Sequence, residues 1–312
     1  MKRVTAVVLN WNGPDDTIAC VMSLRDSGHE GLDIVIVDNA SSDHSVARFR
    51  AEIPDVPLLT RPANGGYATG NNVGIRYALE HGADFVLVVN NDVVVTRHFL
   101  EPMLAEMEAD RAVGIVTCEA KFQSDTSRLY PTGGSISWFR GAGVMLPRRK
   151  RYQRTVVDFV SGCILLVRRE VFEKLGLFDE SFFMYFEDVE FSRRVGQKYR
   201  MVYTPAATVY HRSGGGKSWA GQTTTYLYYM ARNRFIAFQE EPAVYRAYLV
   251  LVSVASAFAK SAAIASHVLA GGSNAAAGSQ LKALWGGFLA GARTLTDSPR
   301  DRSSPTKGVS HG

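Results

Sequence analysis

The sequence predicts an α/β fold built on a mainly parallel sheet, and three observations lead to this prediction. In the first hundred residues, short apolar runs rich in β-branched residues alternate with segments of helical spacing. Each run is nearly continuous, as expected for strands that are buried on both faces of a parallel sheet. The runs also end in polar residues, and ligands of such sheets bind beyond the carboxyl ends of the strands. We therefore expect a βαβα arrangement with a ligand site at that edge.

The expected elements follow one another in a regular order. Strands are predicted over residues 4–9, 34–37, 57–59 and 85–89. Helices are predicted over residues 17–24, from Ser45 onward, and over 71–80. From about 120 to 160 the pattern is irregular, with glycine pairs and a basic run at 148–151, and an ordered strand pattern resumes at 159–167. We expect the irregular stretch to interrupt the sheet on its acceptor side.

Length and composition exclude several classes of protein. The 312 residues are enough for about two domains, and 46% hydrophobic with 21% charged residues is typical of a globular chain. The net charge of +5 is too small to predict a nucleic-acid partner, and none is expected. The three cysteines are far apart and form no CxxC pair, which argues against a zinc ribbon or a disulfide framework. The apolar run at 7–9 is short for a signal peptide, so we expect a cytoplasmic protein.

Two of the strand ends carry carboxylates. Asp38 can accept a hydrogen bond from the imide N–H of a uracil or thymine ring, or it can simply form a turn, as we expect for Asp43. Asn90-Asn91-Asp92 follows the strand at 85–89, where Asp92 could hold Mg²⁺ or Mn²⁺ against a diphosphate. One acid is few for a metal site, so this loop could equally be a turn.

The segment 176–194 mixes five acids with aromatic residues. Such a mixture is costly to bury unless the carboxylates serve a site. On a helix beginning near Glu187, the residues Glu187, Glu190 and Arg194 share one face, while Asp188 points elsewhere from the first turn. Asp188 is therefore a candidate general base. The alternative is a capped helix whose acids complement its dipole.

Two common nucleotide signatures are missing or incomplete. The loop Asn10-Trp11-Asn12-Gly13 has no G-x-G-x-x-G spacing, which disfavours an NAD-dependent oxidoreductase. Gly216-Lys217-Ser218 looks like the end of a phosphate-binding P-loop, but His211 stands where the first glycine belongs.

Taken in order over roughly residues 4 to 236, six motifs resemble those of the family 2 inverting glycosyltransferases, especially the bacterial rhamnosyltransferase-like members. They are Asn10-Trp11-Asn12-Gly13, the stretch 37–43, the stretch 64–74 from Asn64 to Gly74, Asn90-Asn91-Asp92, Phe178-Asp179-Glu180 with Glu187-Asp188, and Tyr210-His211. The resemblance implies a GT-A fold, a nucleotide-diphosphate-sugar donor and a divalent metal.

By this resemblance Asp38 matches the pyrimidine-binding acid, Asp92 the last acid of the D-x-D metal motif, and Asp188 the catalytic base. The other residues implied in donor binding are Asn10, Asn12, Gly66, Asn71, Asn72, Asn91 and Arg232. Two positions depart from the pattern. Asn90 replaces the first acid of D-x-D, and Asn71 replaces a basic residue that contacts phosphate in relatives.

Three residues near the end of the resemblance have two interpretations each. In this family a histidine at the position of His211 can complete the metal shell, and the glycines that follow it would let the loop close over the donor; alternatively, His211 makes a structural hydrogen bond. Arg232 and Arg234 flank Asn233 and either reach a phosphate or face solvent.

The chain changes character after Pro242. From there to Thr296 it has four Lys or Arg residues and no acid, and Arg246, Ser253, Lys260 and His267 recur every seven residues along a mostly apolar helix. Such a helix is typical of an anionic membrane interface. Packing on the protein or in a homodimer is the second interpretation, and a membrane span is the third. Residues 281–290 could add a second anchoring helix.

We therefore expect a catalytic domain at 1–241, with a nucleotide-binding half at 1–118 and an acceptor-side half at 119–241. A helical appendage at 242–296 and a disordered tail at 297–312 would follow. The predicted function is transfer of a deoxyhexose or hexose from a dTDP- or UDP-sugar to a glycan or polyprenyl-linked acceptor. We expect the protein at the inner face of the cell membrane. The alternative is a catalytically silent scaffold with the same fold.

Overall fold

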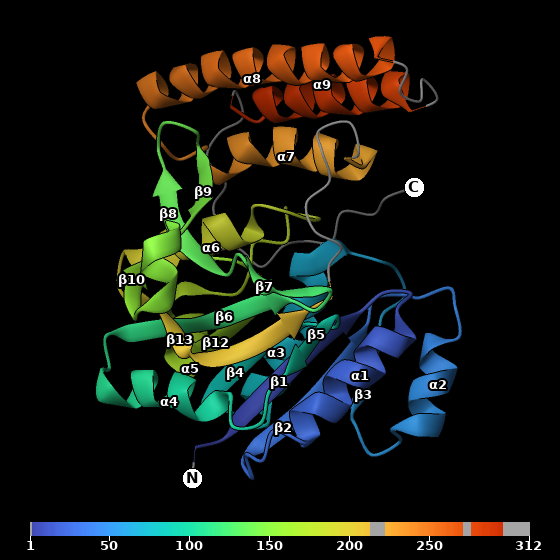
Figure 1. Cartoon of the computed structure of the whole chain (residues 1–312), viewed down its shortest axis with the longest axis vertical. Helices are drawn as coiled ribbons and strands as arrows, with labels where there is room; N and C mark the ends of the chain where they lie inside the picture. The colour runs from blue at the N-terminus through green and yellow to red at the C-terminus, as the bar shows by residue number, and fades with distance from the viewer. Residues whose placement is uncertain (1, 213–221, 271–275, 296–312) are drawn as a thin grey trace. The chain divides into compact units, whose positions relative to one another are not determined.

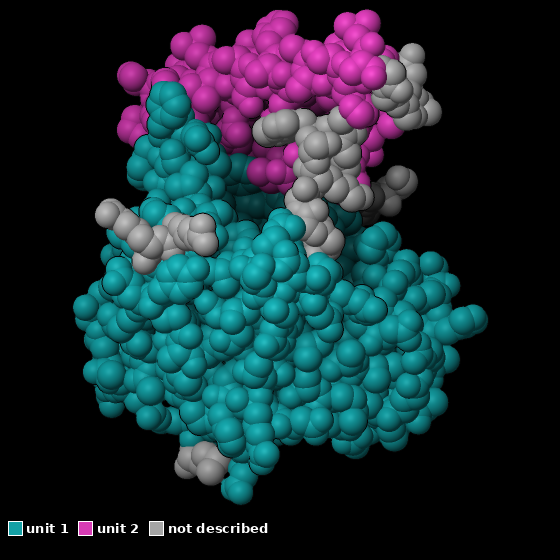
Figure 2. All heavy atoms as spheres, in the orientation of Figure 1, with its two compact units in different colours: residues 1–218 teal, residues 219–312 magenta. Residues whose placement is uncertain are grey.

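The computed structural model describes residues 2–212, 222–270 and 276–295. The chain forms two compact units, residues 1–218 and residues 219–312, which Figure 2 distinguishes by colour. Gly216-Lys217-Ser218, the glycine loop after His211 and the expected tail at 297–312 lie outside the described residues. The boundary between the units precedes the expected domain boundary at 241, so the helix that carries Arg232 belongs to the second unit.

The first half of unit 1 has the predicted βαβα order. Its elements are β1 (Val4–Asn10), α1 (Pro14–Arg25), β2 (Leu32–Asp38), α2 (Ser45–Glu52), β3 (Leu58–Thr60), α3 (Gly66–Glu80) and β4 (Phe85–Asn90). β1 pairs in parallel with both β2 and β4, and β2 pairs in parallel with β3. Proline at the first position of α1 and two acids in its first turn favour a helix start there.

The second half of unit 1 extends the same sheet and adds a small one. Its elements are β5 (Val93–Val95), α4 (Leu100–Ala109), β6 (Val113–Phe122), β7 (Asp125–Tyr130), β8 (Gly133–Ser137), β9 (Ala142–Met145), the 3₁₀ helix η1 (Arg148–Tyr152), β10 (Thr155–Val157), β11 (Phe159–Val160), β12 (Ile164–Arg168), α5 (Arg169–Leu175), α6 (Glu187–Gly196) and β13 (Arg200–His211). The main sheet has the order β10-β13-β6-β12-β4-β1-β2-β3, with β12 antiparallel to its neighbours. Within the irregular stretch of sequence, β8, β9 and β11 form a separate three-stranded sheet, while β7 and β10 join the main sheet beside β6 and β13.

Helices cover both faces of the main sheet, which Figure 1 shows for α1 and α4 on one face. On the other face, α3 packs very closely on β1. A Cβ atom at Gly70 would lie 2.4 Å from Leu9, and one at Gly74 would lie 2.3 Å from Val7. The spacing Gly66, Gly70, Gly74 therefore lets one face of α3 approach the sheet, and the first turn of α3 is fixed close to the ends of the strands.

The second unit consists of the helices α7 (Thr224–Ala237), α8 (Ala243–Leu269) and α9 (Ala277–Arg293) among its described residues. The Thr223 side chain caps α7 by accepting a hydrogen bond from the backbone N–H of Tyr226. Two glycines let α9 approach the α7 backbone, since a Cβ at Gly287 would lie 2.2 Å from the Tyr228 carbonyl oxygen. A Cβ at Gly291 would likewise lie 2.5 Å from the Arg232 carbonyl oxygen.

Arg246 and Ser253 of the polar stripe of α8 are directed into this unit, whereas His267 near its end is exposed. Ser253 is buried and accepts a hydrogen bond from Arg234 of α7, while Arg246 donates to the carbonyl of Leu295 beyond α9. The outward face is apolar and strongly exposed at Val244, Leu251, Phe258 and Leu269. By length and composition α8 could also cross a membrane, and 22% of its most apolar stretch is buried in the structure.

All three cysteines are buried and none forms a disulfide. Cys20 lies on α1, Cys118 on β6, and Cys163 immediately before β12. Burial raises the pKa of each thiol above its ordinary value.

Candidate active site

The predicted ligand edge forms where three neighbouring strands end. Asn10 of β1 stands beside Asp38 of β2, and Leu9 of β1 stands beside Asn90 of β4. The polar residues that follow the three strands are thus brought to one edge of the sheet, as the sequence predicts.

Asp38 is the centre of a hydrogen-bond network at this edge. It is 2% exposed, and its Oδ1 accepts from Asn10 Nδ2 at 2.8 Å and from Ser41 Oγ at 2.6 Å. Its Oδ2 accepts from the Ser41 backbone N–H at 3.0 Å. A carboxylate offers about four acceptor positions, so Asp38 can accept one more bond while its own orientation is fixed.

Asn12 and Asn91 extend this network. Asn12 has a left-handed backbone (φ 53°), and its Oδ1 accepts from the backbone N–H of Ser42 at 2.8 Å, which ties the loop after β1 to the loop after β2. Asn91 Nδ2 donates to Thr17 Oγ1 at 3.0 Å, and Thr17 donates to Asn10 Oδ1 at 2.7 Å. The predicted residues Asn10, Asn12 and Asn91 therefore form one connected group. Separately, Asp43 accepts from the Ser45 backbone N–H, in agreement with the turn interpretation.

Two of the predicted residues on α3, Gly66 and Asn72, contact the segment 176–194 that contains Asp188. A Cβ at Gly66 (φ 82°) would lie 2.0 Å from the Phe183 carbonyl oxygen, so no other residue fits there without movement. The Asn72 amide accepts from the Phe178 N–H at 3.1 Å and donates to the Phe178 carbonyl at 2.9 Å. Asn71 is buried and donates to the Tyr67 carbonyl. Their roles toward a donor stay predictions.

Asp188 lies in the first turn of α6, directly after a strained turn. Tyr185 (φ 68°) and Phe186 (φ 73°) both have left-handed backbones, which is unfavourable for aromatic residues and is found mainly at functional sites. Asp188 Oδ2 accepts from the Gly162 N–H at 3.2 Å, and Oδ1 accepts from its neighbour Val189 at 2.8 Å. Burial raises the pKa of Asp188 to about 6, although these backbone N–H groups act in the opposite direction.

The other acids of α6 differ from Asp188. Glu187 is buried, and its Oε2 has no hydrogen-bond partner among the residues that the structure describes. Burial, reinforced by the charge of Asp188, raises the pKa of Glu187 well above its ordinary value. Glu190, by contrast, forms a two-point ion pair with Arg194, with both N···O distances at 2.9 Å. On the predicted helix face, Glu190 and Arg194 therefore stabilise the fold.

The turn at 161–163 connects Asp188 to the strand edge, and no sequence motif predicts it. Gly162 donates its N–H to Asp188 and accepts a hydrogen bond from the Tyr67 hydroxyl at 2.5 Å. The next residue, Cys163, accepts from the Asn90 N–H at 3.0 Å through its carbonyl. Since these bonds use the backbone, they leave no side-chain motif to recognise. Gly162 and Tyr67 are thus site residues that sequence reasoning missed.

Asp92, two residues after the end of β4, meets His211 at the end of β13. Asp92 Oδ1 lies 3.4 Å from His211 Nε2, and the His211 ring stacks on Tyr130 with ring centroids 4.0 Å apart. Burial raises the pKa of Asp92 and lowers that of His211, while their mutual attraction opposes both shifts. Among the described residues no group of three or more His, Cys, Asp or Glu side chains could hold a metal. A carboxylate and an imidazole facing one another nevertheless fit a cation that takes its remaining oxygen ligands from a diphosphate and water.

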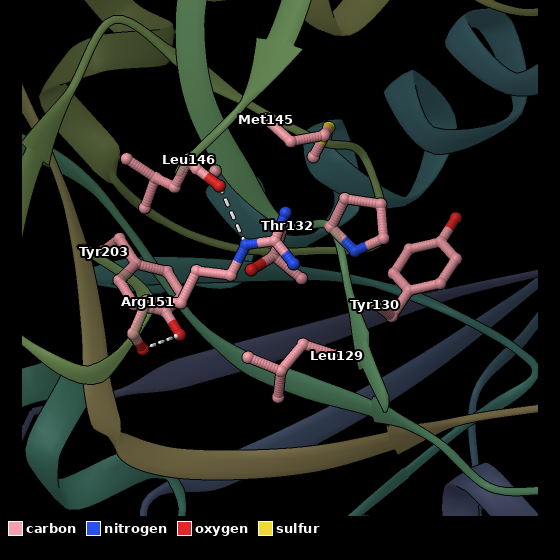
Figure 3. Close-up of a pocket in the computed structure, with 9 residues that line it drawn as sticks. Leu129, Tyr130, Thr132, Met145, Leu146, Arg151 and Tyr203 are labelled. Carbon is pink, nitrogen blue, oxygen red and sulfur yellow. Dashed lines mark hydrogen bonds between the residues drawn. The ribbon is translucent and has the colours of Figure 1, made fainter. Parts of the chain in front are cut away.

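A small pocket lies next to this pair, around the turn that joins β7 to β8 (Figure 3). Tyr130 belongs both to this pocket and to the His211 stack. On the opposite side, Arg151 donates to the Leu146 carbonyl at 2.8 Å, and the Tyr203 hydroxyl donates to the Arg151 carbonyl at 2.8 Å. The pocket therefore has an aromatic wall and a fixed cation.

Two arginines complete the comparison with the predictions. Arg232 lies on α7 in the second unit, where Nη1 donates to Asn233 Oδ1 at 2.7 Å, and its role toward a donor stays a prediction. Arg61, which the motifs did not indicate, donates to Asn39 Oδ1 at 2.7 Å beside the Asp38 loop. Asn39 in turn donates to the Gly66 carbonyl, so Arg61 is a cation held between the strand edge and α3.

Comparison with known proteins agrees with this geometry. The model of the family described as glycosyl transferase family 2 matches residues 5–176. The rhamnosyltransferase WbbL of Escherichia coli is 28% identical over 252 residues, covering 74% of this chain and 94% of the relative. The low-salt glycan biosynthesis hexosyltransferase Agl10 of Haloferax volcanii is 28% identical, with 62% of each chain covered. An N-acetylglucosaminyl-diphospho-decaprenol L-rhamnosyltransferase of Mycobacterium tuberculosis is 29% identical, covering 58% of this chain and 66% of the relative. The chain thus spans less than two thirds of the length of the last two relatives.

Solved structures show the same fold at low sequence identity. The mannosyltransferase PcManGT of Pyrobaculum calidifontis, crystallised with GDP-Man and Mn²⁺, has a TM-score of 0.57 at 20% identity and covers 94% of this chain and 86% of its own. TarS of S. aureus has a TM-score of 0.54 at 15% identity, with 80% of this chain and 69% of its own covered. The GT-A fold expected from the sequence is thereby confirmed. With more than half of its length matched by the family model, this rhamnosyltransferase-like chain belongs to glycosyl transferase family 2.

Proposed function

We propose that the protein transfers a deoxyhexose such as rhamnose, or a hexose, from a dTDP- or UDP-sugar to a glycan or polyprenyl-linked acceptor, with inversion at the anomeric carbon. The observation that carries the proposal is the turn at 161–163, which bonds to Asp188 on one side and to Asn90 on the other. It holds a carboxylate of raised pKa beside the strand edge where a nucleotide diphosphate would bind.

In the proposed reaction, Asp188 is the general base. An acceptor hydroxyl oxygen attacks the anomeric carbon, the bond between that carbon and the diphosphate oxygen breaks, and the hydroxyl proton passes to Asp188. A pKa of about 6 keeps Asp188 mostly ionised at neutral pH and still leaves it basic enough to accept the proton. Its two backbone hydrogen bonds fix the direction of the carboxylate.

Asp92 and His211 would hold the divalent cation, Mg²⁺ or Mn²⁺. When bound, this ion would neutralise charge on the departing nucleoside diphosphate. With Asn90 in place of a second acid, the chain supplies few charged ligands, so we expect weak metal affinity in the absence of donor. Tyr130 packs flat on the imidazole and keeps the ring in place.

Asp38 would accept the imide N–H of the pyrimidine base. The network from Asn10 and Ser41 orients the carboxylate before the nucleotide binds. The loop residues tied together by Asn12 would enclose the nucleotide at this edge. Adenine has no imide N–H, so this contact favours uridine and thymidine nucleotides.

The second unit would place the protein at the inner face of the cell membrane. The exposed apolar residues of α8 form an outward surface suited to the boundary of head groups and acyl chains, and Leu289 of α9 is exposed as well. The unit has no acid between Pro242 and Thr296, so anionic lipids would attract it. A relative whose name specifies a diphospho-decaprenol substrate supports a lipid-linked acceptor.

The proposal is tested by incubating full-length protein with dTDP-rhamnose and with UDP-sugars, with and without Mn²⁺, and measuring nucleoside diphosphate release. We expect slow hydrolysis of a pyrimidine nucleotide sugar that depends on the metal and on Asp188. Release of the sugar with the opposite anomeric configuration, followed by NMR, would show inversion. A folded protein that neither binds nor hydrolyses these donors would instead support the silent scaffold.

A further inference from the structure

The segment from Thr126 to Val157 in unit 1 is strongly basic. It contains seven Lys or Arg residues and no Asp or Glu, whereas the rest of the chain has 28 bases and 30 acids. The positive net charge of the protein therefore comes entirely from these residues. Neither the donor site nor the base uses this charge, so the segment calls for a partner or a structural role of its own.

A structural role accounts for only part of the charge. Three of the seven cations are held by other parts of the fold, namely Arg154 by an ion pair with Glu106, Arg128 over the Phe122 ring, and Arg151 by the Leu146 carbonyl. Arg140 lies in the turn between β8 and β9, and Lys150 lies in η1. Both are exposed to solvent, where their charges are open to a partner.

The same segment exposes large apolar side chains. In the described part of unit 1, six such side chains are strongly exposed, and four of them belong to this segment, namely Trp138, Phe139, Tyr152 and Val156. Phe139 is 74% exposed at the hairpin tip, and Tyr152 is 65% exposed at the end of η1. The Trp138 ring also contacts the Arg193 guanidinium of α6. Exposed apolar groups gathered in one stretch indicate an interaction surface.

The surface is extended. Figure 1 shows the β8–β9 hairpin projecting away from the main sheet. From Arg140 at its tip to Leu146 at its base the chain spans about 20 Å. η1 is fixed at the base, because Arg151 donates to the Leu146 carbonyl and accepts from the Tyr203 hydroxyl through its own carbonyl. One small anion could not meet the cations at both ends, whereas a broad anionic surface could.

We propose that the segment 126–157 is a membrane-contact surface of unit 1, which binds an anionic lipid bilayer. Aromatic side chains are enriched at the level of the lipid head groups, and anionic lipids attract exposed Lys and Arg residues. The proposal rests on the proposed function in taking the protein to act at a membrane. It goes further, because the catalytic unit would bind the bilayer through residues of its own and not only through the helices of the second unit.

The surface is connected directly to the base. β8 pairs with β11 (Phe159–Val160), and the Ser161 N–H donates to the Thr132 carbonyl at 2.9 Å. The next residue, Gly162, donates its N–H to Asp188. Contact of the segment with a bilayer would therefore hold the catalytic turn at a defined height above the lipids. A lipid-linked acceptor presents its sugar in that layer.

The test is sedimentation of the full-length protein with vesicles of phosphatidylcholine and phosphatidylglycerol. The double variant Arg140→Gln, Lys150→Gln should bind about thirtyfold more weakly than wild type, from about fivefold for each cation near an anionic surface. The difference should disappear at high salt. The matched control is Arg50→Gln, Lys174→Gln, which removes the same charge from exposed positions on α2 and α5 and should bind as wild type does.

Trp138→Tyr separates this surface from the second unit. Phospholipids with brominated acyl chains quench tryptophans that reach the bilayer. We expect Trp138→Tyr to lose part of the quenching seen for wild type and still to sediment with the vesicles. Melting temperatures equal to that of wild type would show that the variants are folded. If quenching is unchanged in Trp138→Tyr and the double variant binds as wild type does, unit 1 does not touch the bilayer and the proposal is wrong.

An anionic glycan is the alternative occupant of the surface. Normal vesicle binding by the double variant, with weaker transfer to a water-soluble acceptor, would indicate a glycan contact and overturn the membrane contact. Donor hydrolysis is measured separately. Weakened vesicle binding by the double variant, in a protein whose wild type hydrolyses no nucleotide sugar, would uphold the surface and reject the proposed function. Normal hydrolysis with vesicle binding unaffected by the double variant would do the reverse.

Discussion

The network around Asp38 and the first turn of α6 are both built on buried or half-buried acids, but they are constructed in opposite ways. Asp38 receives three hydrogen bonds from two neighbours, and the loops around it are tied to one another by amide side chains. Glu187 and Asp188 are adjacent acids that follow two left-handed aromatic residues, and one oxygen of Glu187 has no hydrogen-bond partner in the described part of the chain.

The difference shows how one sheet edge can support two tasks. A carboxylate held by three hydrogen bonds has a fixed orientation and one acceptor position left, which suits recognition of a fixed ring. A carboxylate such as Asp188, whose pKa is raised by burial, suits proton transfer. If this comparison is right, changes at Asp38 should affect binding, and changes around Asp188 should affect the rate and its pH dependence.

The largest effect is expected for Asp188→Asn. An amide keeps the shape but cannot accept the proton, so the transfer rate should fall by roughly 10²–10⁴-fold with nucleotide affinity nearly unchanged. Steady-state transfer or donor hydrolysis together with calorimetric binding of UDP measures both. Asp179→Asn is the control from the same segment, because the Asp179 carboxylate accepts from the Ser181 N–H within its own turn, and the change should have little effect. A folded Asp188→Asn protein with normal turnover would exclude Asp188 as the base.

Asp38→Ala should act on binding instead. Loss of a charged acceptor should weaken UDP and dTDP roughly ten- to a hundredfold, to the same extent for the free diphosphate and the nucleotide sugar. Isothermal titration calorimetry with the free nucleoside diphosphate and with the nucleotide sugar measures the two affinities. Asp43→Ala removes an acid from the same loop whose carboxylate accepts from the Ser45 N–H and makes no contact with Asp38, and it should change affinity little. Unchanged binding in a folded Asp38→Ala protein would remove the pyrimidine contact from the proposal.

The pH dependence gives a third test. Because the pKa of Asp188 is raised to about 6, the base becomes protonated as the pH falls through that value, and the rate falls with it. Between pH 7 and pH 5 the ionised fraction falls about tenfold, which sets the expected loss in kcat. Nucleotide binding measured over the same range should change less. A rate that stays level down to pH 5 would contradict a base with this pKa.

Tyr67→Phe should have the smallest effect. When the Tyr67 hydroxyl is removed, the Gly162 carbonyl loses the hydrogen bond that helps to direct the Gly162 N–H toward Asp188. The rate should fall about two- to tenfold, as for one neutral hydrogen bond, and the midpoint of the pH profile should move upward, because ionised Asp188 is less stabilised. Tyr77→Phe on the same helix is the control, since Tyr77 stacks on His81. A lower rate with an unmoved midpoint would mean that Tyr67 acts only on the fold.

Much of the candidate site could be predicted because its side chains lie at the ends of strands and the starts of helices, which the sequence pattern indicates. Asp38 ends β2, Asn90 ends β4, and Asp188 lies in the first turn of α6, all as the sequence pattern indicated. The link between them was not predictable. Gly162 and Cys163 act through backbone atoms, so their chemistry is independent of side-chain type and is determined only when distant segments meet.

The second unit illustrates a different limit. The heptad spacing of Arg246, Ser253 and Lys260 correctly placed them on one stripe of a helix. Periodicity gives the stripe but not the direction in which it faces, which depends on the neighbouring helices. Here Arg234 and the chain beyond α9 supply hydrogen-bond partners on the inner side. The apolar face is consequently left on the surface.

The three buried cysteines can be used to measure local opening of the fold, because each is covered in the folded protein. Alkylating reagents react with thiolates, and burial keeps Cys20, Cys118 and Cys163 both covered and protonated. Labelling must therefore wait for a local or global unfolding event. Cys163 directly follows Gly162, so its labelling rate would register separation of the base from the strand edge, while Cys118 in the centre of the sheet would register unfolding of the core. The ratio of the two labelling rates would therefore report motion within the site relative to unfolding of the core, and it uses native cysteines only.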